Sequence, residues 1–232
     1  MISIIIPTLN EQVAIPETLS CLLAQQASYT SEFEVIVVDG GSSDGTLSVI
    51  DSYRSNFDKL IVTTTPAGRA KQLNAGAKLA SGETLLFLHA DTLLPDNGLE
   101  KIDAVLRDLT IAAGCFRHKF SGSQWSLSFI SCLHNWRFRL TNIIYGDQAM
   151  FIRRSLFFQV GGFPEQLAED IYFSQQLLSL TRPKMLHAYV TTDSRKFKQI
   201  GIWRALLQVI RIQLQHRRGE TIKHPQFFQN YR

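Results

Sequence analysis

Carboxylate side chains recur at four separated points of this sequence. Glu11, Asp39 and Asp91 each stand at or just past the end of an apolar run, and the pair Glu169-Asp170 opens a late helical segment. A carboxylate can accept several hydrogen bonds, hold a divalent cation or take up a proton during a reaction. These positions are therefore the first candidates for chemistry, provided that the fold brings them together.

The glycine-rich segment 37–46, VVDGGSSDGT, predicts a strand, a turn and the start of a helix. Asp39 at the strand end could accept hydrogen bonds from the edge of a planar base or from ribose, whereas Ser43 or Asp44 is most simply a helix cap. The segment lacks both GxxxxGK(S/T) and GxGxxG. It therefore does not indicate a P-loop kinase or a dinucleotide-dependent dehydrogenase.

The segment PTLNE, residues 7–11, allows two interpretations. In the simpler one, Asn10 caps a helix and Glu11 stabilises its positive end. In the functional one, Pro7 and Thr8 present backbone groups to a planar base, and Glu11 reaches toward ribose hydroxyls.

Arg69 stands in the first turn of a predicted helix within GRAKQLNAGA, residues 68–77. A cation at this position opposes the helix dipole, so the placement is mildly unfavourable without a negatively charged partner. A bound nucleotide would supply that partner. An ordinary solvated arginine is the more frequent outcome for such a residue taken alone.

His89 and Asp91 are two residues apart at the end of a leucine-rich run, which places both on one side of a strand. Two such groups could hold a divalent cation against a diphosphate, although Asp91 could also form a turn. Glu169 and Asp170 could simply favour the start of a helix. The functional interpretation is that Asp170 accepts a proton from an attacking hydroxyl, with Glu169 as the alternative base.

Alternating element types would position these groups. Apolar runs at 2–8, 34–40, 60–65 and 84–90 predict strands, and segments at 11–26, 44–56, 68–81 and 98–109 have helical spacing. This alternation predicts right-handed βαβ units and a largely parallel, buried α/β sheet. Because ligands bind at the carboxyl edge of such sheets, function is expected there.

The second half of the chain lacks the regular alternation of strands and helices. Strands are predicted at 112–120, 148–153 and 185–192, with a helix at 165–178 and an aromatic-rich stretch at 125–140. Four aromatic side chains of that stretch either make core, the usual outcome, or form a stacking wall for a sugar or lipid: Trp125, Phe129, Trp136 and Phe138.

We expect one domain over 1–218 and a polar tail at 219–232. Within the domain, 1–110 is the expected nucleotide-binding half, 111–197 the acceptor half and 198–218 an amphipathic helix. This helix could pack on the domain, contact a homodimer partner or rest on a membrane through 200–218.

Bulk properties fit a folded cytoplasmic protein. The 232 residues are 45% hydrophobic and 19% charged, and the net charge of +4 does not require nucleic acid as a partner. Three dispersed cysteines without a CxxC pair indicate a reducing compartment. No apolar stretch reaches the ~18 residues of a membrane span, so any membrane association, on the inner face, is expected to be peripheral.

The ordered motifs PTLNE, VVDGGSSDGT, GRAKQLNAGA, LFLHADT, GDQAMFIRR and GGFPEQLAEDIYFSQQL resemble the inverting family 2 glycosyltransferases of GT-A fold. Within that family the chain is most similar to the rSAM/selenodomain-associated transferase 2 group, in which the HADT form recurs and a late basic motif corresponds to DSRKF, residues 193–197. The resemblance covers nearly all of residues 1–180.

The resemblance implies a nucleotide-sugar donor, a hydroxyl acceptor, Mn2+ or Mg2+, and an inverting reaction in which Asp170 is the base. It places Asp91 at the metal. His89 stands where the usual acidic pair begins, so it is either a second metal ligand, which would tilt the choice toward Mn2+, or a contact to ribose only. Asp147 or Gln148 would contact the acceptor sugar, and Arg195 with Lys196 would neutralise diphosphate. The implied donor-binding residues are Pro7, Thr8, Asn10, Glu11, Asp39, Arg69, His89, Ala90 and Arg195.

Two rival functions follow from the same residues. A non-catalytic nucleotide-sugar-binding or scaffold protein is the alternative, because His89 breaks the acidic metal pair. A nucleotidyltransferase of related fold is disfavoured because the GxGxR loop and its lysine are absent after the first strand.

Overall fold

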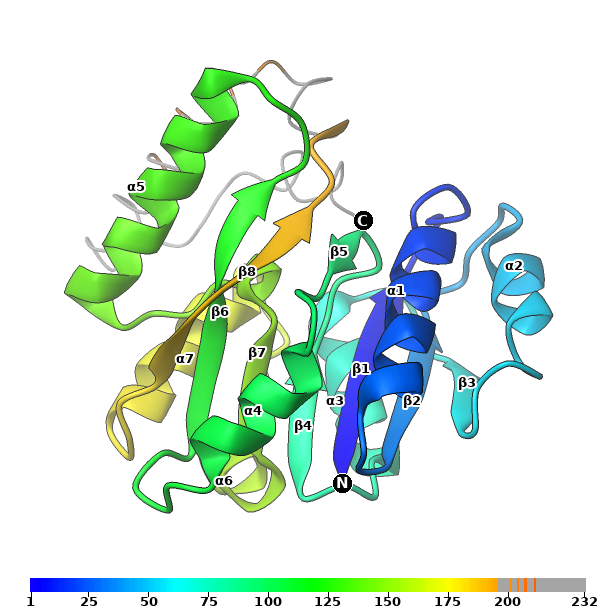
Figure 1. Ribbon diagram of the computed structural model, residues 1–232, viewed down its shortest axis with the longest axis horizontal. Helices are drawn as coiled ribbons and strands as arrows, with labels where there is room; N and C mark the ends of the chain where they lie inside the picture. The colour runs from blue at the N-terminus through cyan, green and yellow to red at the C-terminus, as the bar shows by residue number, and fades with distance from the viewer. Residues whose placement is uncertain (196–200, 202–203, 205–206, 208–210, 212–232) are drawn as a thin grey trace.

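The computed structural model describes residues 1–195 and the isolated positions 201, 204, 207 and 211. The described residues form an 8-stranded sheet in the order β3-β2-β1-β4-β7-β6-β8-β5, with helices on both faces (Figure 1). The predicted helix 198–218 and the tail 219–232 lie outside the described residues apart from those isolated positions.

The first half of the chain builds the parallel part of the sheet, β3-β2-β1-β4. Its alternation of strands and helices confirms the predicted βαβ units. The elements are β1 (Ile2–Thr8), α1 (Ile15–Ser28), β2 (Phe33–Asp39), α2 (Thr46–Ser52), β3 (Leu60–Thr64), α3 (Arg69–Leu79) and β4 (Thr84–Phe87).

The second half extends the same sheet with mixed pairing. β7 is antiparallel to β4 and β6, β6 is parallel to β8, and β8 is antiparallel to β5. The elements are β5 (Thr92–Leu93), α4 (Gly98–Leu106), β6 (Ala113–Phe120), α5 (Trp125–Thr141), the 3-10 helix η1 (Gly146–Gln148), β7 (Met150–Arg153), α6 (Arg154–Val160), α7 (Glu169–Leu178) and β8 (Lys184–Thr192).

Apolar side chains of the central strands pack on both faces of the sheet. Ile4 and Val35 join residues of α1 and α4 in one core cluster, whereas Ile5 and Ile36 join residues of α3, α6 and α7 in the other. All four strand side chains are fully buried. This two-sided burial is the physical reason why the strands read as continuous apolar runs instead of alternating ones.

Two predicted boundaries near the sheet edge are wrong. α1 begins at Ile15, and Asn10 adopts a left-handed conformation with φ 56° before it, so Asn10 does not cap that helix. Its Oδ1 instead accepts a hydrogen bond of 2.8 Å from the backbone nitrogen of Ser43. β4 ends at Phe87, so a loop past the strand, and not strand alternation, positions His89 and Asp91.

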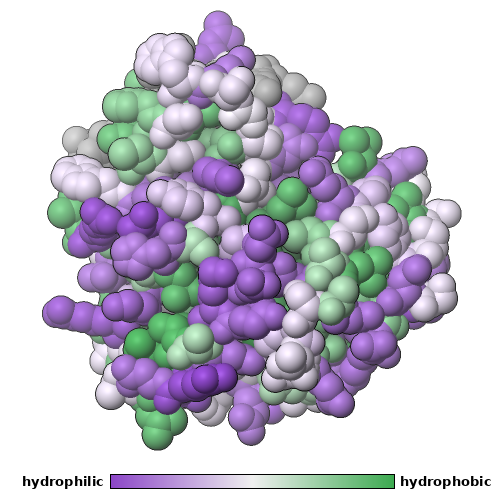
Figure 2. All heavy atoms as spheres, viewed as in Figure 1, coloured by the Kyte–Doolittle hydropathy of each residue, from purple (hydrophilic) through white to green (hydrophobic). Residues whose placement is uncertain are grey.

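The aromatic-rich stretch is a regular helix, α5, and most of its aromatic residues are not core. Trp125, Phe129 and Trp136 are exposed, and only Phe138 among the four predicted aromatics is buried. Figure 2 shows hydrophobic residues over α5 and others scattered among the hydrophilic residues of the same face. Neither α6 nor the short strand β5 was predicted from the sequence.

Candidate active site

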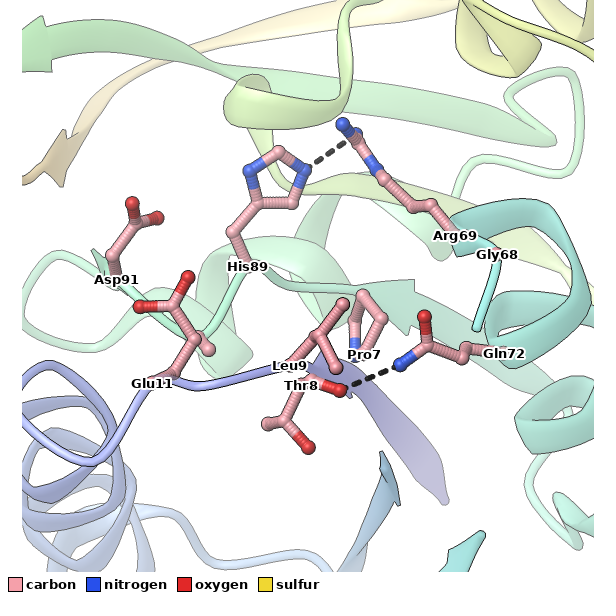
Figure 3. A pocket seen from close by; sticks show the side chains of 10 residues that line it. Pro7, Thr8, Leu9, Glu11, Gly68, Arg69, Gln72, His89 and Asp91 are labelled. Carbon is pink, nitrogen blue, oxygen red and sulfur yellow. Dashed lines mark hydrogen bonds between the residues drawn. The ribbon is translucent and has the colours of Figure 1, made fainter. Parts of the chain in front are cut away.

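A small recess, open to solvent, lies at the carboxyl ends of β1 and β4 beside the start of α3 (Figure 3). The recess thus lies at the carboxyl edge of the sheet, where ligand binding was expected from the strand pattern. The predicted site residues that meet in its wall are Pro7, Thr8, Glu11, Arg69, His89, Ala90 and Asp91.

Glu11 and Asp91 lie close together on the side of the recess away from Gln72 (Figure 3). The backbone of Glu11 is fixed by α2, because its nitrogen donates a hydrogen bond of 2.8 Å to Thr46 Oγ1 at the start of that helix. Thr92 Oγ1 donates to Asp91 Oδ1 at 3.4 Å, and β5 then fixes Thr92 against Thr192 of β8. The loop after β1 and the loop after β4 thus bring two carboxylates to one wall.

Asp39 lies behind Thr8 and is fully buried. Its Oδ2 accepts hydrogen bonds of 2.8 Å from the backbone nitrogens of Gly41 and Ser42, and its Oδ1 accepts from the hydroxyls of Ser42 at 2.5 Å and Thr8 at 3.3 Å. In this arrangement Asp39 fixes the glycine-rich turn. Its contact to a base or ribose stays a prediction.

Gln72 is a wall residue that sequence reasoning missed. Its Nε2 donates hydrogen bonds of 2.8 Å to the carbonyl oxygens of Thr8 and Val38, which ties α3 to the ends of β1 and β2. Its spacing of three residues from Arg69, on the same helix face, was the available signal.

Arg69 is not the solvated arginine that its helix position favoured, because the protein itself supplies its anionic partners. Its Nε lies 2.9 Å from Glu169 Oε1, and its Nη2 lies 4.0 Å from Asp170 Oδ2. Burial would lower the pKa of Arg69, but the carboxylates of Glu169 and Asp170 outweigh burial and raise it. The guanidinium therefore stays charged and bridges the two halves of the sheet.

His89 faces the same guanidinium, with its Nε2 at 2.5 Å from Arg69 Nη2 (Figure 3). A guanidinium only donates hydrogen bonds, so Nε2 is the acceptor and the proton of the neutral ring is on Nδ1. In this tautomer His89 is a hydrogen-bond donor toward the side of the recess where Asp91 lies.

Glu169 and Asp170 open α7 and do not line the recess, but Arg69 connects them to it. Asp170 Oδ2 accepts a hydrogen bond of 2.7 Å from the backbone nitrogen of Gly146, and Oδ1 accepts 2.9 Å from Ile171. Gly146 is pressed against Arg69, because a Cβ at this position would stand 1.6 Å from Nη2. Only glycine fits there without moving the guanidinium.

The predicted acceptor residues after Gly146 have different environments. Gln148 is fully buried, and its Oε1 accepts hydrogen bonds from the Tyr145 backbone nitrogen at 3.1 Å and from Arg137 at 3.2 Å. The predicted contact of Gln148 with a sugar hydroxyl is therefore wrong for this arrangement. Asp147 instead faces His118 and His134, two residues that sequence reasoning did not single out.

Burial and neighbouring charges shift the pKa values of His118 and Asp147. Burial lowers the pKa of His118 to about 4, which Asp147 only partly opposes. Burial would raise the pKa of Asp147, but His134 and His118 outweigh it and hold that pKa well below its usual range. At neutral pH the group therefore combines a carboxylate with an uncharged His118.

Arg195 follows β8, and its positive charge is paired with Asp193 of the same loop. Its backbone nitrogen donates 2.8 Å to Asp193 Oδ1, and its Nε forms an ion pair with Oδ2 of the same residue. The Asp193 backbone nitrogen in turn donates 3.0 Å to the carbonyl oxygen of Asp91. Arg195 thus stands two residues after a backbone contact with the Asp91 loop, whereas Lys196 lies outside the described residues.

Known structures share this fold at 26–27% sequence identity. The mannosyltransferase PcManGT from Pyrobaculum calidifontis, in complex with GDP-Man and Mn2+, matches with a TM-score of 0.71 over 89% of this chain and 60% of its own. S. aureus TarS 1-349 in complex with UDP-GlcNAc matches with a TM-score of 0.68 over 84% and 58%. The predicted GT-A-type fold is confirmed, and this chain spans somewhat under two thirds of those two structures.

Sequence comparisons give the same family. Residues 3–162 match the model described as Glycosyl transferase family 2. A PGL/p-HBAD biosynthesis glycosyltransferase of Mycobacterium bovis is 34% identical over 211 residues, which cover 87% of this chain and 78% of that protein. A match over this much of the chain shows that it belongs to glycosyl transferase family 2.

Proposed function

We propose that this glycosyltransferase moves a hexose from a UDP- or GDP-sugar to an acceptor hydroxyl with inversion at the anomeric carbon. The observation that carries the proposal is the recess at the carboxyl edge, joined through Arg69 to the carboxylates of Glu169 and Asp170. Nucleotide-sugars in TarS and PcManGT support the donor class.

In this proposal the nucleoside lies against the loop after β1. Pro7 and Thr8 present backbone groups to the base, with Asp39 behind them, and Glu11 contacts ribose hydroxyls. Arg69 faces the phosphates, and its raised pKa keeps it cationic there. Asn10, Ala90 and Arg195 complete the proposed donor contacts.

The donor set of the recess fits a divalent cation. Asp91 offers carboxylate oxygens, which suit Mg2+ or Mn2+. His89 is the second proposed metal contact, but accepting from Arg69 through Nε2 favours its alternative role as a donor to the ligand. A bound cation would supply Lewis-acid stabilisation of the leaving diphosphate.

Asp170 is the proposed base because its carboxylate is more exposed than that of Glu169 and lies farther from the guanidinium of Arg69. Glu169 is paired with Arg69 at 2.9 Å and its side chain is 8% exposed, whereas Asp170 is 4.0 Å from the guanidinium and 15% exposed. In the proposed step the acceptor oxygen bonds to the anomeric carbon and its proton passes to Asp170. The bond from that carbon to the diphosphate oxygen breaks from the opposite face, which inverts the centre.

Asp170→Asn tests this assignment. Because a positioned base contributes roughly 10²- to 10⁴-fold, the variant should lose transfer by that factor while donor affinity stays within about threefold. Initial rates with UDP- and GDP-sugars, with and without Mn2+, and donor binding by calorimetry measure both quantities. The exposed Asp51→Asn is the matched control and should keep full activity.

An unchanged initial rate in Asp170→Asn would contradict the base assignment. A non-catalytic scaffold is the second candidate, and it predicts nucleotide-sugar binding without either transfer or donor hydrolysis by the unaltered protein. The HADT segment, in which His89 replaces an acid, is the observation that favours testing it.

Peripheral membrane contact and homodimer formation through 200–218 stay proposals, since this segment is largely outside the described residues. Among the described residues, the structure contains no helix with the length and apolar character required to cross a membrane. Flotation of the full chain with anionic liposomes tests the membrane proposal, and light scattering tests the dimer.

A further inference from the structure

His118 of β6, His134 of α5 and Asp147 of η1 converge at one point outside the recess. One ligand atom from each lies within 4.8 Å of the other two. Nε2 of His134 is 3.3 Å from Asp147 Oδ1, and Nε2 of His118 is 3.7 Å from Oδ2. Three separate elements therefore direct nitrogen and oxygen atoms toward a common centre.

These atoms are buried, yet they lack hydrogen bonds. His118 is fully buried, and neither of its ring nitrogens has a hydrogen-bond partner among the described residues. The same holds for both nitrogens of His134 and for Oδ1 of Asp147. Unsatisfied buried polar atoms each cost about 1–3 kcal/mol, and a ligand bound through one atom of each residue would give a partner to three of these five.

Aromatic packing holds the rings in place. His118 meets Phe120 edge-on at 4.5 Å between ring centroids, and His134 meets Tyr145 edge-on at 5.3 Å. The two imidazoles lie 5.0 Å apart. The nitrogens are thus positioned before any ligand arrives, which lowers the entropic cost of binding one.

The donor set and spacing fit a transition-metal ion. With Zn2+ bonds of about 2.0–2.1 Å and tetrahedral angles, neighbouring ligand atoms lie about 3.3 Å apart, close to the 3.3 and 3.7 Å between the histidine nitrogens and the Asp147 oxygens. Two imidazoles and one carboxylate select Zn2+ or a similar ion over Mg2+. Three protein ligands leave a fourth position for water or another group.

We propose that His118, His134 and Asp147 bind one divalent transition-metal ion of the zinc class, at a site separate from the cation contact at Asp91. The ion clamps η1 to α5 and β6. Gly146, next to Asp147, donates to Asp170 at 2.7 Å and packs on Arg69, so the clamp also fixes the neighbours of the proposed base. That last consequence, but not the binding itself, rests on the proposed function.

Metal uptake by the full chain tests the site directly. Chelator-treated protein without nucleotide is dialysed against Zn2+, and Co2+ is added separately so that ligand-field absorption reports nitrogen coordination. We expect one Zn2+ per chain with an absorbing Co2+ form. His134→Gln and Asp147→Asn should weaken binding at least about tenfold, a loss of about 1.4 kcal/mol.

Two control variants separate this site from other ligands. Asp91→Asn removes the proposed donor-site contact, and His187→Gln removes an exposed histidine of β8. Both should keep the Zn2+ stoichiometry and the Co2+ spectrum. A Cys132→Ser background removes an exposed thiol that would bind zinc adventitiously.

The outcomes distinguish this inference from the proposed function. Unaltered protein that takes up no Zn2+ and gives no Co2+ absorption overturns the site, whatever the variants do, and leaves a metal-free His-Asp-His cluster. Uptake that survives in both His134→Gln and Asp147→Asn also overturns it. Sugar transfer without metal uptake refutes only the site, and metal uptake without sugar transfer refutes only the proposed function.

Discussion

At the scale of single residues, Arg69 connects groups that are distant in the sequence. Its guanidinium meets His89 from the loop after β4 and Glu169 from α7, so the two halves of the sheet share one partly buried cation. The position of that cation depends on the lack of a side chain at Gly146. A small substitution there tests the network without altering any of its charges.

Gly146→Ala should displace Arg69, because the new Cβ would stand 1.6 Å from Nη2 and 2.7 Å from His89 Nε2. We expect a 10- to 100-fold lower turnover, since a misplacement of about 1 Å can cost roughly 100-fold. Steady-state kinetics with the donor identified by the nucleotide screen measures this. Gly98→Ala at the start of the distant α4 is the control, and equal losses in both variants would contradict the explanation.

At the scale of elements, α3 carries Arg69 and Gln72 to the recess because it packs unusually close to the sheet. A Cβ at Gly76 would meet Ile5 Cγ2 of β1 at 2.4 Å and Val38 Cγ2 of β2 at 3.2 Å. The helix thus lies where its first turn reaches the ends of β1 and β2, and Gln72 secures it there through hydrogen bonds to both strands.

Gly76→Ala should push α3 away from β1 and lower the free energy of unfolding. Inserting a methyl group into a packed contact typically costs about 1–3 kcal/mol, which exceeds the gain of replacing glycine inside a helix. Urea denaturation measures the change. Lys78→Ala on the exposed face of the same helix should stay within about 0.5 kcal/mol, and a Gly76 variant as stable as this control would refute the close-packing argument.

At the scale of the whole molecule, the two ends of the parallel strands have different tasks. The carboxyl ends form the recess, whereas a buried carboxylate, Glu34, joins the other end. Its oxygens contact Lys59 at 2.5 Å, Ser3 at 2.6 Å and the backbone nitrogen of Ser81 at 2.6 Å. Burial would raise the pKa of Glu34, but these contacts, Lys59 first, outweigh it and lower the pKa to about 2.

Glu34→Gln should therefore change the pH dependence of stability without touching the recess. Because the folded pKa of about 2 lies below the ordinary 4.5, the stabilisation is present above 4.5 and is lost as the pH falls toward 2. We expect the variant to be less stable than the unaltered protein by about 1–3 kcal/mol at neutral pH, with the gap closing in acid. Urea titrations across this pH range measure it.

The neighbouring exposed Glu32→Gln is the control for that comparison. It should track the unaltered protein at every pH. A gap between Glu34→Gln and the unaltered protein that stays constant down to pH about 2 would show that the ionised carboxylate is not what stabilises this end of the sheet.

Sequence alone determined the parallel half of the sheet and the edge at which the recess lies. Apolar runs buried on both faces, separated by segments with helical spacing, specify βαβ units. Because the crossover in each unit makes its strands parallel, the carboxyl ends of β1 and β4 lie at one edge of the sheet. Glu11 and Asp91 could therefore both be expected near this edge from local patterns, whereas the structure placed them in the wall of one recess.

Only the tertiary structure decided which groups pair across that edge. The carboxylate partners of Arg69 lie in α7. Asn10 accepts a hydrogen bond from the Ser43 backbone nitrogen instead of capping α1. His118, His134 and Asp147 come from three different elements. Local periodicity records how a segment is buried, but it does not record which distant segment covers it. Long-range packing supplies that information, and here it converts dispersed charged residues into connected sites.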